Sequence, residues 1–379
     1  MNKKLIAIAI AAAVSAPAMA ATSNVEVYGL MNIGVDSVTN GSGVAGNHDT
    51  TRVGRVTDYV SRIGFKGTED LGNGLAAVWQ IEQQISSDGS DGAGAGVLGQ
   101  SATGASLRNT FVGLKSKDMG EVRLGRHDTP YKMATGSLDQ FGDTMADYNG
   151  LVSAANGRGA SSYFDQRASN VVAYITPNFS GFTAVGAYVF GAESATTGSP
   201  DSSGNAYSLA GMYTAGPLYL TAAYEKHNFG SAGVGSLGGV ANTDEKAWKL
   251  GASYSIMDFT LAAMYEKTDD SLAAGANKYG HRTWFLSGKY QMGAVALKAQ
   301  YANAGSDDQT FGTVKGDDGA KQYSLGVDYG FSKRTTLYAL YSKVSNDTNA
   351  AYGFKEGNVA GLVAGDTISG VTVGMKHSF

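Results

Sequence analysis

Hydrophobic and polar residues alternate one by one along much of this 379-residue chain, most clearly at its C-terminal end. The apolar side chains there fall on one face of an extended strand: Val371, Val373, Met375 and Phe379. The opposite face carries small or polar residues: Thr372, Gly374, Lys376 and Ser378. A strand with one apolar and one polar face suits a wall between lipid and water.

The same period-2 pattern recurs in segments of about ten residues, the length of a tilted membrane-spanning strand. It covers residues 25–36, 218–224, 295–301 and 322–331. Tyrosine and phenylalanine recur near the ends of these segments, as Tyr323, Tyr329 and Phe331 do in the last of them. A soluble sandwich would also bury an apolar face, but aromatic residues at both strand ends are typical of the two membrane interfaces.

The connections between these segments are of two kinds. Short ones are predicted at 70–74, 118–120, 177–181, 215–217, 292–293 and 331–333. Long ones, rich in Gly, Ser and Asp, are predicted at 38–57, 86–106, 127–166, 191–205, 228–245, 269–280, 304–320 and 346–366. Short turns on one rim and long loops on the other predict an all-β, antiparallel transmembrane barrel of about 16 strands.

The first residues predict export. Residues 1–20 combine Lys3 and Lys4, an apolar run too short to span a bilayer, and an A-x-A cleavage site at 18–20. Residues 21–379 would then form one barrel domain in the outer membrane of a Gram-negative cell. Loss of the two lysines changes the formal net charge from −4 to −6, which argues against a nucleic-acid partner.

Composition and motifs give no sign of cofactor or metal chemistry. The chain has no cysteine, and its five histidines are scattered. A G-x-G-x-x-G match at residues 41–46 lies in a loop with no following helix pattern, so we assign it no nucleotide. No serine-hydrolase motif is recognisable, and we expect no cofactor, no metal and no catalytic residue.

Several segments together resemble the general trimeric porins of β-proteobacteria. The quoted stretches are Val60–Leu75 with Trp79–Glu82, Arg108–Lys115 with Val122–Arg126, Tyr174–Phe182, Phe331–Thr335 and the terminal phenylalanine. The resemblance covers nearly all of residues 21–379 and implies a water-filled barrel, three to an assembly, with the third external loop folded into the pore. That loop would lie within 127–166. The resemblance also implies that Phe379 is the signal for barrel assembly.

The resemblance further implies a charged constriction. Basic wall positions correspond to Arg62, Arg108 and Arg167, and acids of the third loop to Asp139, Asp143 and Asp147. These acids occupy a loop that departs from the family's usual Pro-Glu-Phe-Gly-Gly. For Arg62 the alternation agrees independently, because Ile63 and Phe65 take the apolar face and leave Arg62 on the wet one.

Opposed charges across a narrow wet gap predict a passive diffusion channel for small hydrophilic solutes and ions. Two alternatives remain: a solute-selective channel, and a surface protein or adhesin that uses the barrel as an anchor. The expected partners are two further copies of the chain in a homotrimer, membrane lipids and lipopolysaccharide. The sign of ion selectivity stays open.

Overall fold

The computed structural model describes residues 24–41, 51–88, 107–153, 164–191, 204–229, 243–269, 280–306, 310–311, 314–359 and 362–379. The predicted signal segment and its cleavage site lie outside these residues and stay predictions. In the described part of the chain, no helix is long and apolar enough to cross a membrane.

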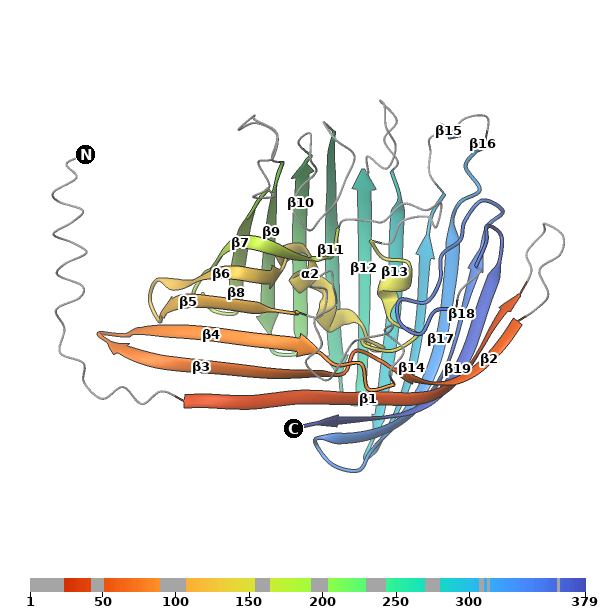
Figure 1. Ribbon diagram of the computed structural model, residues 1–379, viewed down its shortest axis with the longest axis horizontal. Helices are drawn as coiled ribbons and strands as arrows, with labels where there is room; N and C mark the ends of the chain where they lie inside the picture. The colour runs from red at the N-terminus through yellow and green to blue at the C-terminus, as the bar shows by residue number, and fades with distance from the viewer. Residues whose placement is uncertain are drawn as a thin grey trace.

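Seventeen strands of the described residues form a single antiparallel sheet (Figure 1). They are β1 (Asn24–Gly41), β2 (Thr51–Asp58), β3 (Arg62–Gly72), β4 (Leu75–Gln84), β5 (Thr110–Ser116), β6 (Gly120–Asp128), β7 (Arg167–Ile175), β8 (Phe182–Phe190), β9 (Asn205–Ala215), β10 (Leu218–Asn228), β11 (Asp244–Ile256), β12 (Phe259–Asp269), β13 (Arg282–Met292), β14 (Val295–Ala304), β17 (Ala320–Gly330), β18 (Thr335–Asn346) and β19 (Thr367–Ser378). The short strands β15 (Thr310–Phe311) and β16 (Val314–Lys315) form a separate hairpin. From β3 onward each long strand pairs with the next along the chain, and β19 pairs with β1, so the sheet closes.

Strands β2 and β3 act as one interrupted strand. β2 pairs with the second half of β1, from Ile33 to Asn40, and β3 pairs with the first half. The chain leaves the ladder between them, where Val60 adopts a φ of 63°. Because β2 and β3 share one position in the barrel wall, the barrel has 16 strand positions, as predicted, although the sheet contains one strand more.

One predicted loop was too long. Residues 38–57 were expected to be irregular, but β1 continues to Gly41 and β2 begins at Thr51. The polar side chains of this region hid the strand, because its ladder with β1 is formed by backbone hydrogen bonds that an alternating apolar pattern does not mark. Polar side chains add to the pairing, since Arg55 and Thr57 both bond Asp36 of β1.

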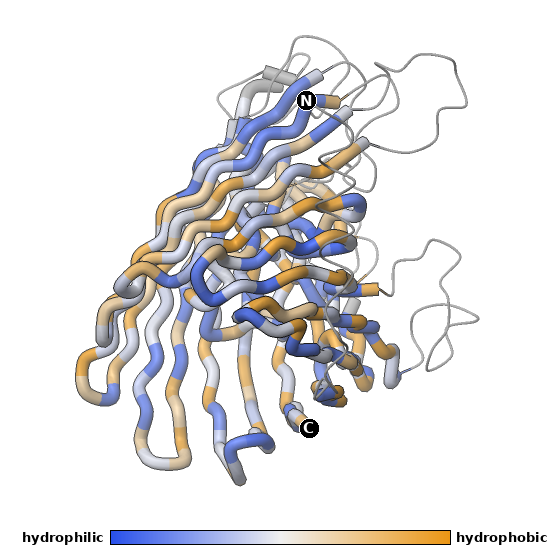
Figure 2. The backbone as a smooth tube through the Cα atoms, turned by 90° about the vertical axis from the view of Figure 1, so that its left-hand side faces the viewer, coloured by the Kyte–Doolittle hydropathy of each residue, from blue (hydrophilic) through white to orange (hydrophobic). Residues whose placement is uncertain are grey.

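Hydrophobic and hydrophilic residues alternate along the strands, as the pattern predicted (Figure 2). Val371, Val373 and Met375 are 50–56% exposed on the outer face, whereas Thr372 between them is 1% exposed inside. The predicted short turns also occur, and the two-residue turn at Met257–Asp258 adds one that the pattern missed. The predicted loops 86–106, 191–205, 228–245 and 269–280 lie mostly outside the described residues.

The terminal Phe379 completes the closure of the barrel. Its backbone exchanges hydrogen bonds of 3.1 and 3.2 Å with Gly29 of β1, one step beyond the β1–β19 ladder. Its ring lies over Gly29, where a Cβ would collide with it. Glycine at position 29 thus makes room for the last side chain at the seam.

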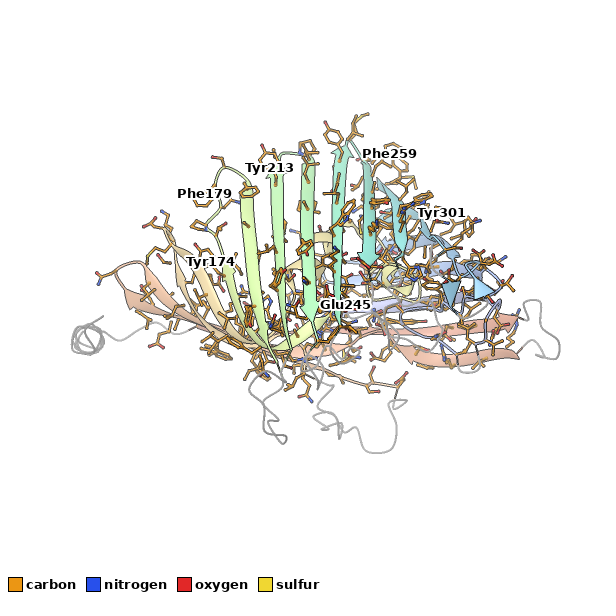
Figure 3. The ribbon with its side chains drawn as sticks, turned by 90° about the horizontal axis from the view of Figure 1, so that it is seen from above. Tyr174, Phe179, Tyr213, Glu245, Phe259 and Tyr301 are labelled. Atoms are coloured by element: carbon orange, nitrogen blue, oxygen red, sulfur yellow. The ribbon has the colours of Figure 1, made fainter. Side chains whose placement is uncertain are left out.

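Two groups of strands on the outer face differ in the side chains that they expose. On β8, β9, β11, β12, β13, β17 and β18, which we call the aromatic sector, large rings are exposed on the outer face: Phe182, Tyr188, Tyr213, Trp248, Tyr254, Phe259, Tyr265, Trp284, Tyr323, Tyr329 and Tyr341. Figure 3 labels two of them, Tyr213 and Phe259. On β19, β1, β5 and β6, which we call the aliphatic sector, the described outward residues before Phe379 are mostly aliphatic: Val25, Val27, Val35, Val112, Leu114, Val122, Leu124, Val371, Val373 and Met375.

Candidate functional site

The described residues between β6 and β7, 129–153 and 164–166, lie against the inner wall of the barrel. This segment contains helix α2 (Pro130–Thr135) and two 3₁₀ turns, η1 (Gly136–Leu138) and η2 (Tyr148–Gly150). Thr129 caps α2, since its hydroxyl accepts a hydrogen bond from the backbone N–H of Lys132 at 3.3 Å. The helix contacts β9, β10 and β11 within the curve of the sheet (Figure 1).

Three apolar side chains of this segment pack where the wall has glycine. A Cβ at Gly251 would lie 2.5 Å from Leu138 Cδ1, and one at Gly326 would lie 2.7 Å from Phe141 Cε1. Met145 packs in the same way at Gly370, at 3.0 Å. Any larger wall residue at these positions would push the segment away from the wall, so the barrel sequence is shaped to receive it.

Inward polar side chains also hold the backbone of the segment. The donors come from β1, β10, β13, β14 and β19, and each bonds a carbonyl oxygen: Asn32 to Asp143 (2.6 Å), Tyr219 to Ala134 (2.7 Å), Ser287 to Leu138 (3.0 Å), Gln300 to Ala146 (2.9 Å) and Lys376 to Gly142 (2.8 Å). These bonds satisfy backbone groups that leave bulk water when the segment packs inside the barrel.

Buried charged side chains of the wall hold the segment at two places, Asp165 and Ser153. Lys249 of β11 pairs with Asp165 at 2.9 Å, and both side chains are almost fully buried. Glu266 of β12 accepts hydrogen bonds from the Tyr131 hydroxyl at 2.8 Å and from the Ser153 backbone N–H, also at 2.8 Å. Burial of these carboxylates is tolerated because each has charged or hydrogen-bonding partners.

Arg62 is the predicted wall arginine that meets a predicted loop acid. Its Nη1 lies 2.8 Å from Asp143 Oδ2, with the two side chains 22% and 31% exposed. Asp143 adopts a φ of 55°, a left-handed conformation for which Asp is one of the better-suited residues. This pair joins β3 to the loop and keeps both charges in contact with water.

Arg108 instead pairs with an acid of the wall. Its Nε bonds Glu82 of β4 at 2.5 Å, and its backbone N–H bonds the Glu82 carbonyl oxygen at 2.8 Å. Tyr28 of β1 donates its hydroxyl to the other oxygen of Glu82 at 2.9 Å, with its ring lying over Gly64. The sequence analysis missed Glu82, which compensates much of the charge of Arg108.

Arg167 is placed similarly. Its guanidinium lies 2.9 Å from Asp128 of β6, and its Nε donates to Asn109 Oδ1 at 2.8 Å. Asn109 in turn donates its amide to Asp128 at 2.9 Å. Asp128 is a second wall acid that the sequence analysis did not name.

The remaining predicted loop acids mainly organise the loop. Asp139 accepts hydrogen bonds from the backbone N–H groups of Phe141 (2.7 Å) and Tyr148 (3.2 Å). Asp147 accepts from those of Asn149 (2.9 Å) and Asp143 (3.2 Å). Burial, together with the neighbouring Asp147, raises the pKa of Asp139 well above its usual range, and burial is also the main reason that the pKa of Asp147 is raised. Neither acid is paired with a wall arginine in these contacts.

A further carboxyl group comes from the last long loop. Glu356 lines a cavity of about 230 Å³ together with Arg55 and Asp58. Burial raises the pKa of Glu356 to about 7, Lys355 opposes that shift, and the charges of Asp147 and Asp143 add to it. Nothing in the local sequence distinguished this glutamate from other loop acids.

Comparison with known proteins agrees with this geometry. The family model described as Gram-negative porin matches residues 7–350. Outer membrane porin protein 32 of Delftia acidovorans is 32% identical over 383 residues, which cover 100% of both chains. An outer membrane porin protein of Bordetella pertussis is 29% identical over 91% of this chain and 95% of its own.

Solved structures show the same fold. The anion-selective porin from Comamonas acidovorans superposes with a TM-score of 0.74 at 29% identity, covering 94% of this chain and 100% of the other. The trimer form of OmpT from Vibrio cholerae gives a TM-score of 0.62 at 17% identity, covering 94% of this chain and 99% of the other. At 17% identity, the second likeness concerns the fold alone.

Proposed function

The chain belongs to the Gram-negative porin family and forms a passive channel of the outer membrane, and we propose that Arg62, Arg108 and Arg167 face the acids of the inward-folded loop at its constriction. The observation that carries this proposal is the ion pair between Arg62 of the wall and Asp143 of the loop. The packing of the segment at three wall glycines supports a loop that narrows the pore.

The mechanism is physical. Fixed cations on the wall and fixed anions on the loop create a field across the pore, in which small polar solutes orient while bulky or apolar ones lose hydration without compensation. In a water-like medium, a charge about 4 Å from a passing ion changes its energy by about 1 kcal/mol. Single charges therefore tune the selectivity of such a pore and do not switch it.

We propose weak ion selectivity for this pore. Glu82 and Asp128 offset Arg108 and Arg167, and Asp143 offsets Arg62. The Comamonas relative is described as anion-selective, and a wall with three arginines is compatible with a modest preference of that sign. The three pairs keep the net charge of this region small.

The experiment that tests the constriction is the substitution Arg108→Ala in protein reconstituted in a planar bilayer. We expect the reversal potential in a potassium chloride gradient to move toward cations, because Glu82 loses its partner. The control is Lys117→Ala, which also removes one positive charge. Lys117 lies in the short turn between β5 and β6, away from the proposed constriction. An unchanged reversal potential for Arg108→Ala would remove Arg108 from the constriction.

We also propose that three barrels associate through the aliphatic sector. Aromatic residues prefer the headgroup region, so an outer face that largely lacks them is suited to contact protein. The trimer form of the Vibrio OmpT supports this assembly by fold likeness. Val27 is 53% exposed on β1, and Val27→Arg should weaken the oligomer by placing a charge in an apolar contact. Unchanged migration of the unheated oligomer on a gel would contradict this interface.

A further inference from the structure

The break between β2 and β3 inserts one extra residue into the barrel wall. Residues 59–61 face only residues 31 and 32 of β1, because the ladder resumes at Arg62, which lies opposite Leu30. Three residues therefore stand opposite two, as in a β-bulge. Val60, in the middle, has a φ of 63°, which a β-branched residue adopts where its surroundings impose it. We call residues 59–61 the insertion.

The insertion determines the direction in which Arg62 points. Before it, Thr57 is buried inside the barrel and Val56 is exposed outside, so odd-numbered residues face inward. After it the order is reversed, because Phe65 is exposed outside and Arg62 meets Asp143 inside. Without the extra residue, the period-2 alternation of a strand would place Arg62 on the lipid-facing side.

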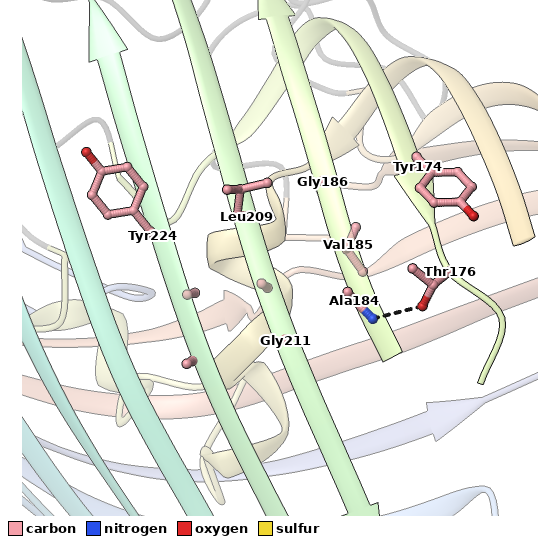
Figure 4. A pocket seen from close by; sticks show the side chains of 11 residues that line it. Tyr174, Thr176, Ala184, Val185, Gly186, Leu209, Gly211 and Tyr224 are labelled. Carbon is pink, nitrogen blue, oxygen red and sulfur yellow. Dashed lines mark hydrogen bonds between the residues drawn. The ribbon is translucent and has the colours of Figure 1, made fainter. Parts of the chain in front are cut away.

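Side chains complete the hydrogen bonding where a ladder ends. At the short turn between β7 and β8, the Thr176 hydroxyl accepts a hydrogen bond from the Ala184 backbone N–H at 3.0 Å (Figure 4). At the insertion, the Ser61 hydroxyl accepts one from the backbone N–H of Asn32 at 2.9 Å. The Asn32 carbonyl oxygen in turn accepts from the N–H of Tyr59 at 2.8 Å. The backbone of Asn32 therefore bonds both ends of the insertion.

The side chain of Asn32 joins the insertion to the loop. It is fully buried, and its nitrogen donates to the carbonyl oxygens of Tyr59 at 2.9 Å and of Asp143 at 2.6 Å. Its oxygen accepts a hydrogen bond from the Tyr338 hydroxyl at 3.0 Å. The reverse orientation of the amide would bring its oxygen against two carbonyl oxygens, so the hydrogen-bond partners fix which end points to the loop.

Arg62 links the same two parts on their water-facing side. Its Nη1 lies 3.3 Å from the carbonyl oxygen of Val60 and 2.8 Å from Asp143 Oδ2. The insertion and Asp143 are thus joined by a guanidinium in contact with water and by a buried amide. Because Asn32 is buried, it acts on a passing ion through the placement of these two charges.

We propose that Asn32 is a positioning residue of the constriction. Its backbone holds the insertion that turns Arg62 into the pore, and its amide holds the backbone of the loop acid that Arg62 meets. The two opposed charges are thereby kept in register by a residue that does not touch the solute. This inference rests on the proposed constriction, in which Arg62 and Asp143 act on passing ions.

Reversal potentials in a potassium chloride gradient test this role. Asn32→Leu keeps a similar shape and the backbone bonds to the insertion, but it removes all three side-chain hydrogen bonds. The Asp143 carboxylate should then move away from Arg62, and the ratio of cation to anion permeability should fall by about twofold at most, since water and salt screen the freed charge. Adding Asp143→Asn to Asn32→Leu should change the ratio little further, because both substitutions break the same contact. Fully additive effects of the two substitutions would overturn the proposal.

Two tyrosine variants provide a test with less risk of misfolding. Tyr338→Phe removes the hydroxyl that orients the Asn32 amide and should shift the ratio in the same direction as Asn32→Leu, but by less. The matched control is Tyr219→Phe, which removes a hydroxyl that bonds the loop carbonyl of Ala134 at 2.7 Å. It should lower the unfolding temperature slightly and leave the ratio unchanged. An equal shift in both tyrosine variants would mean that any loosening of the loop changes the ratio, and would overturn the specific role of Asn32.

Asp143→Asn in the otherwise unchanged protein separates this inference from the constriction itself. A shift with Asp143→Asn, but none with Asn32→Leu or Tyr338→Phe, would overturn the role of Asn32 and leave the constriction standing. If Asn32→Leu does not fold, Tyr338→Phe alone decides. Unchanged ratios in both Asp143→Asn and Arg62→Ala would overturn the constriction and the role of Asn32 together.

Discussion

Two parts of the pore wall hold their arginines in different ways. On β3, Arg62 reaches away from the wall to Asp143 of the loop, and both side chains keep substantial contact with water. Near β5 and β7, Arg108 and Arg167 pair with Glu82 and Asp128 of the wall itself, and these side chains are 10–20% exposed. A pair that bridges wall and loop sustains a field across the pore, whereas a pair within the wall largely cancels itself at a distance.

The number of inward-facing arginines therefore does not determine whether the pore prefers cations or anions. In the constriction that we propose, the wall acids reduce the cationic charge that acts on a passing ion. The comparison can be tested by neutralising the acids one at a time and recording reversal potentials in a potassium chloride gradient.

The largest effect is expected for Glu82→Gln. Arg108 would lose its carboxylate partner in a region with little water to screen the remaining charge. The ratio of cation to anion permeability should fall roughly fivefold, the change that about 1 kcal/mol produces. Glu69→Gln, an exposed acid near the short turn after β3, is the matched control and should leave the ratio unchanged. A ratio unchanged in both variants would mean that ions pass far from Arg108.

A smaller shift of the same sign is expected for Asp143→Asn. Arg62 would lose its partner, but this pair is more exposed, so water and salt screen the uncompensated charge better. The permeability ratio should fall about twofold, since screening leaves only a fraction of the full interaction. A larger effect than that of Glu82→Gln would reverse the comparison between the two parts of the wall.

The third effect depends on pH. Burial raises the pKa of Glu356 from its ordinary value of 4.5 to about 7, so the group is neutral in acid and becomes an anion as the pH rises through neutrality. The cation preference should therefore increase modestly as the pH rises through about 7, and Glu356→Gln should abolish that increase. Because the pKa of Glu356 is higher in the folded protein, protonation of this group favours folding. Its contribution to the free energy of unfolding is fully present below about pH 4.5 and is lost as the pH rises to about 7. A pH response that persists in the variant would have to come from another group.

The smallest effect on selectivity is expected for Asp139→Asn. Asp139 bonds backbone groups inside the loop, and its raised pKa favours the neutral form. The reversal potential should stay within experimental error of the wild type. The unfolding temperature should fall slightly, because an amide has one acceptor oxygen whereas both carboxyl oxygens of Asp139 accept a backbone N–H. A shift as large as that of Asp143→Asn would mean that Asp139 contributes to the field across the pore.

The fold was predictable from sequence because a membrane wall imposes a strict alternation on every strand. The terminal strand shows this, with Val371, Val373 and Met375 outside and Thr372 inside. Strand β2 was not predicted, because a strand at the long-loop rim can pair without apolar residues or strict alternation. Its pairing runs from Ile33 with Asp58 to Asn40 with Thr51, and polar side chains such as Arg55 and Thr57 support it by bonding Asp36 of β1.

The site was only partly predictable. The family resemblance pointed to Arg62, Arg108 and Arg167, and alternation agreed independently for Arg62. The partners of these arginines depend on register and on loop folding, which neither argument gives. Glu82 reaches the site because Gly64 separates it from Tyr28 in adjacent strands, an arrangement that requires the exact pairing of β1, β3 and β4. Glu356 arrives from a loop far along the chain from Arg108, the arginine whose charge opposes the rise of its pKa.

The central claim, an open pore with a weakly selective charged constriction, is tested most directly by single-channel current from purified protein under a potassium chloride gradient. We predict large ohmic steps that close in thirds and a reversal potential displaced only slightly from zero. Silence from folded, heat-modifiable protein would contradict the channel and favour a barrel-anchored surface protein. A reversal potential near the limit for one ion would contradict the internal compensation of the wall.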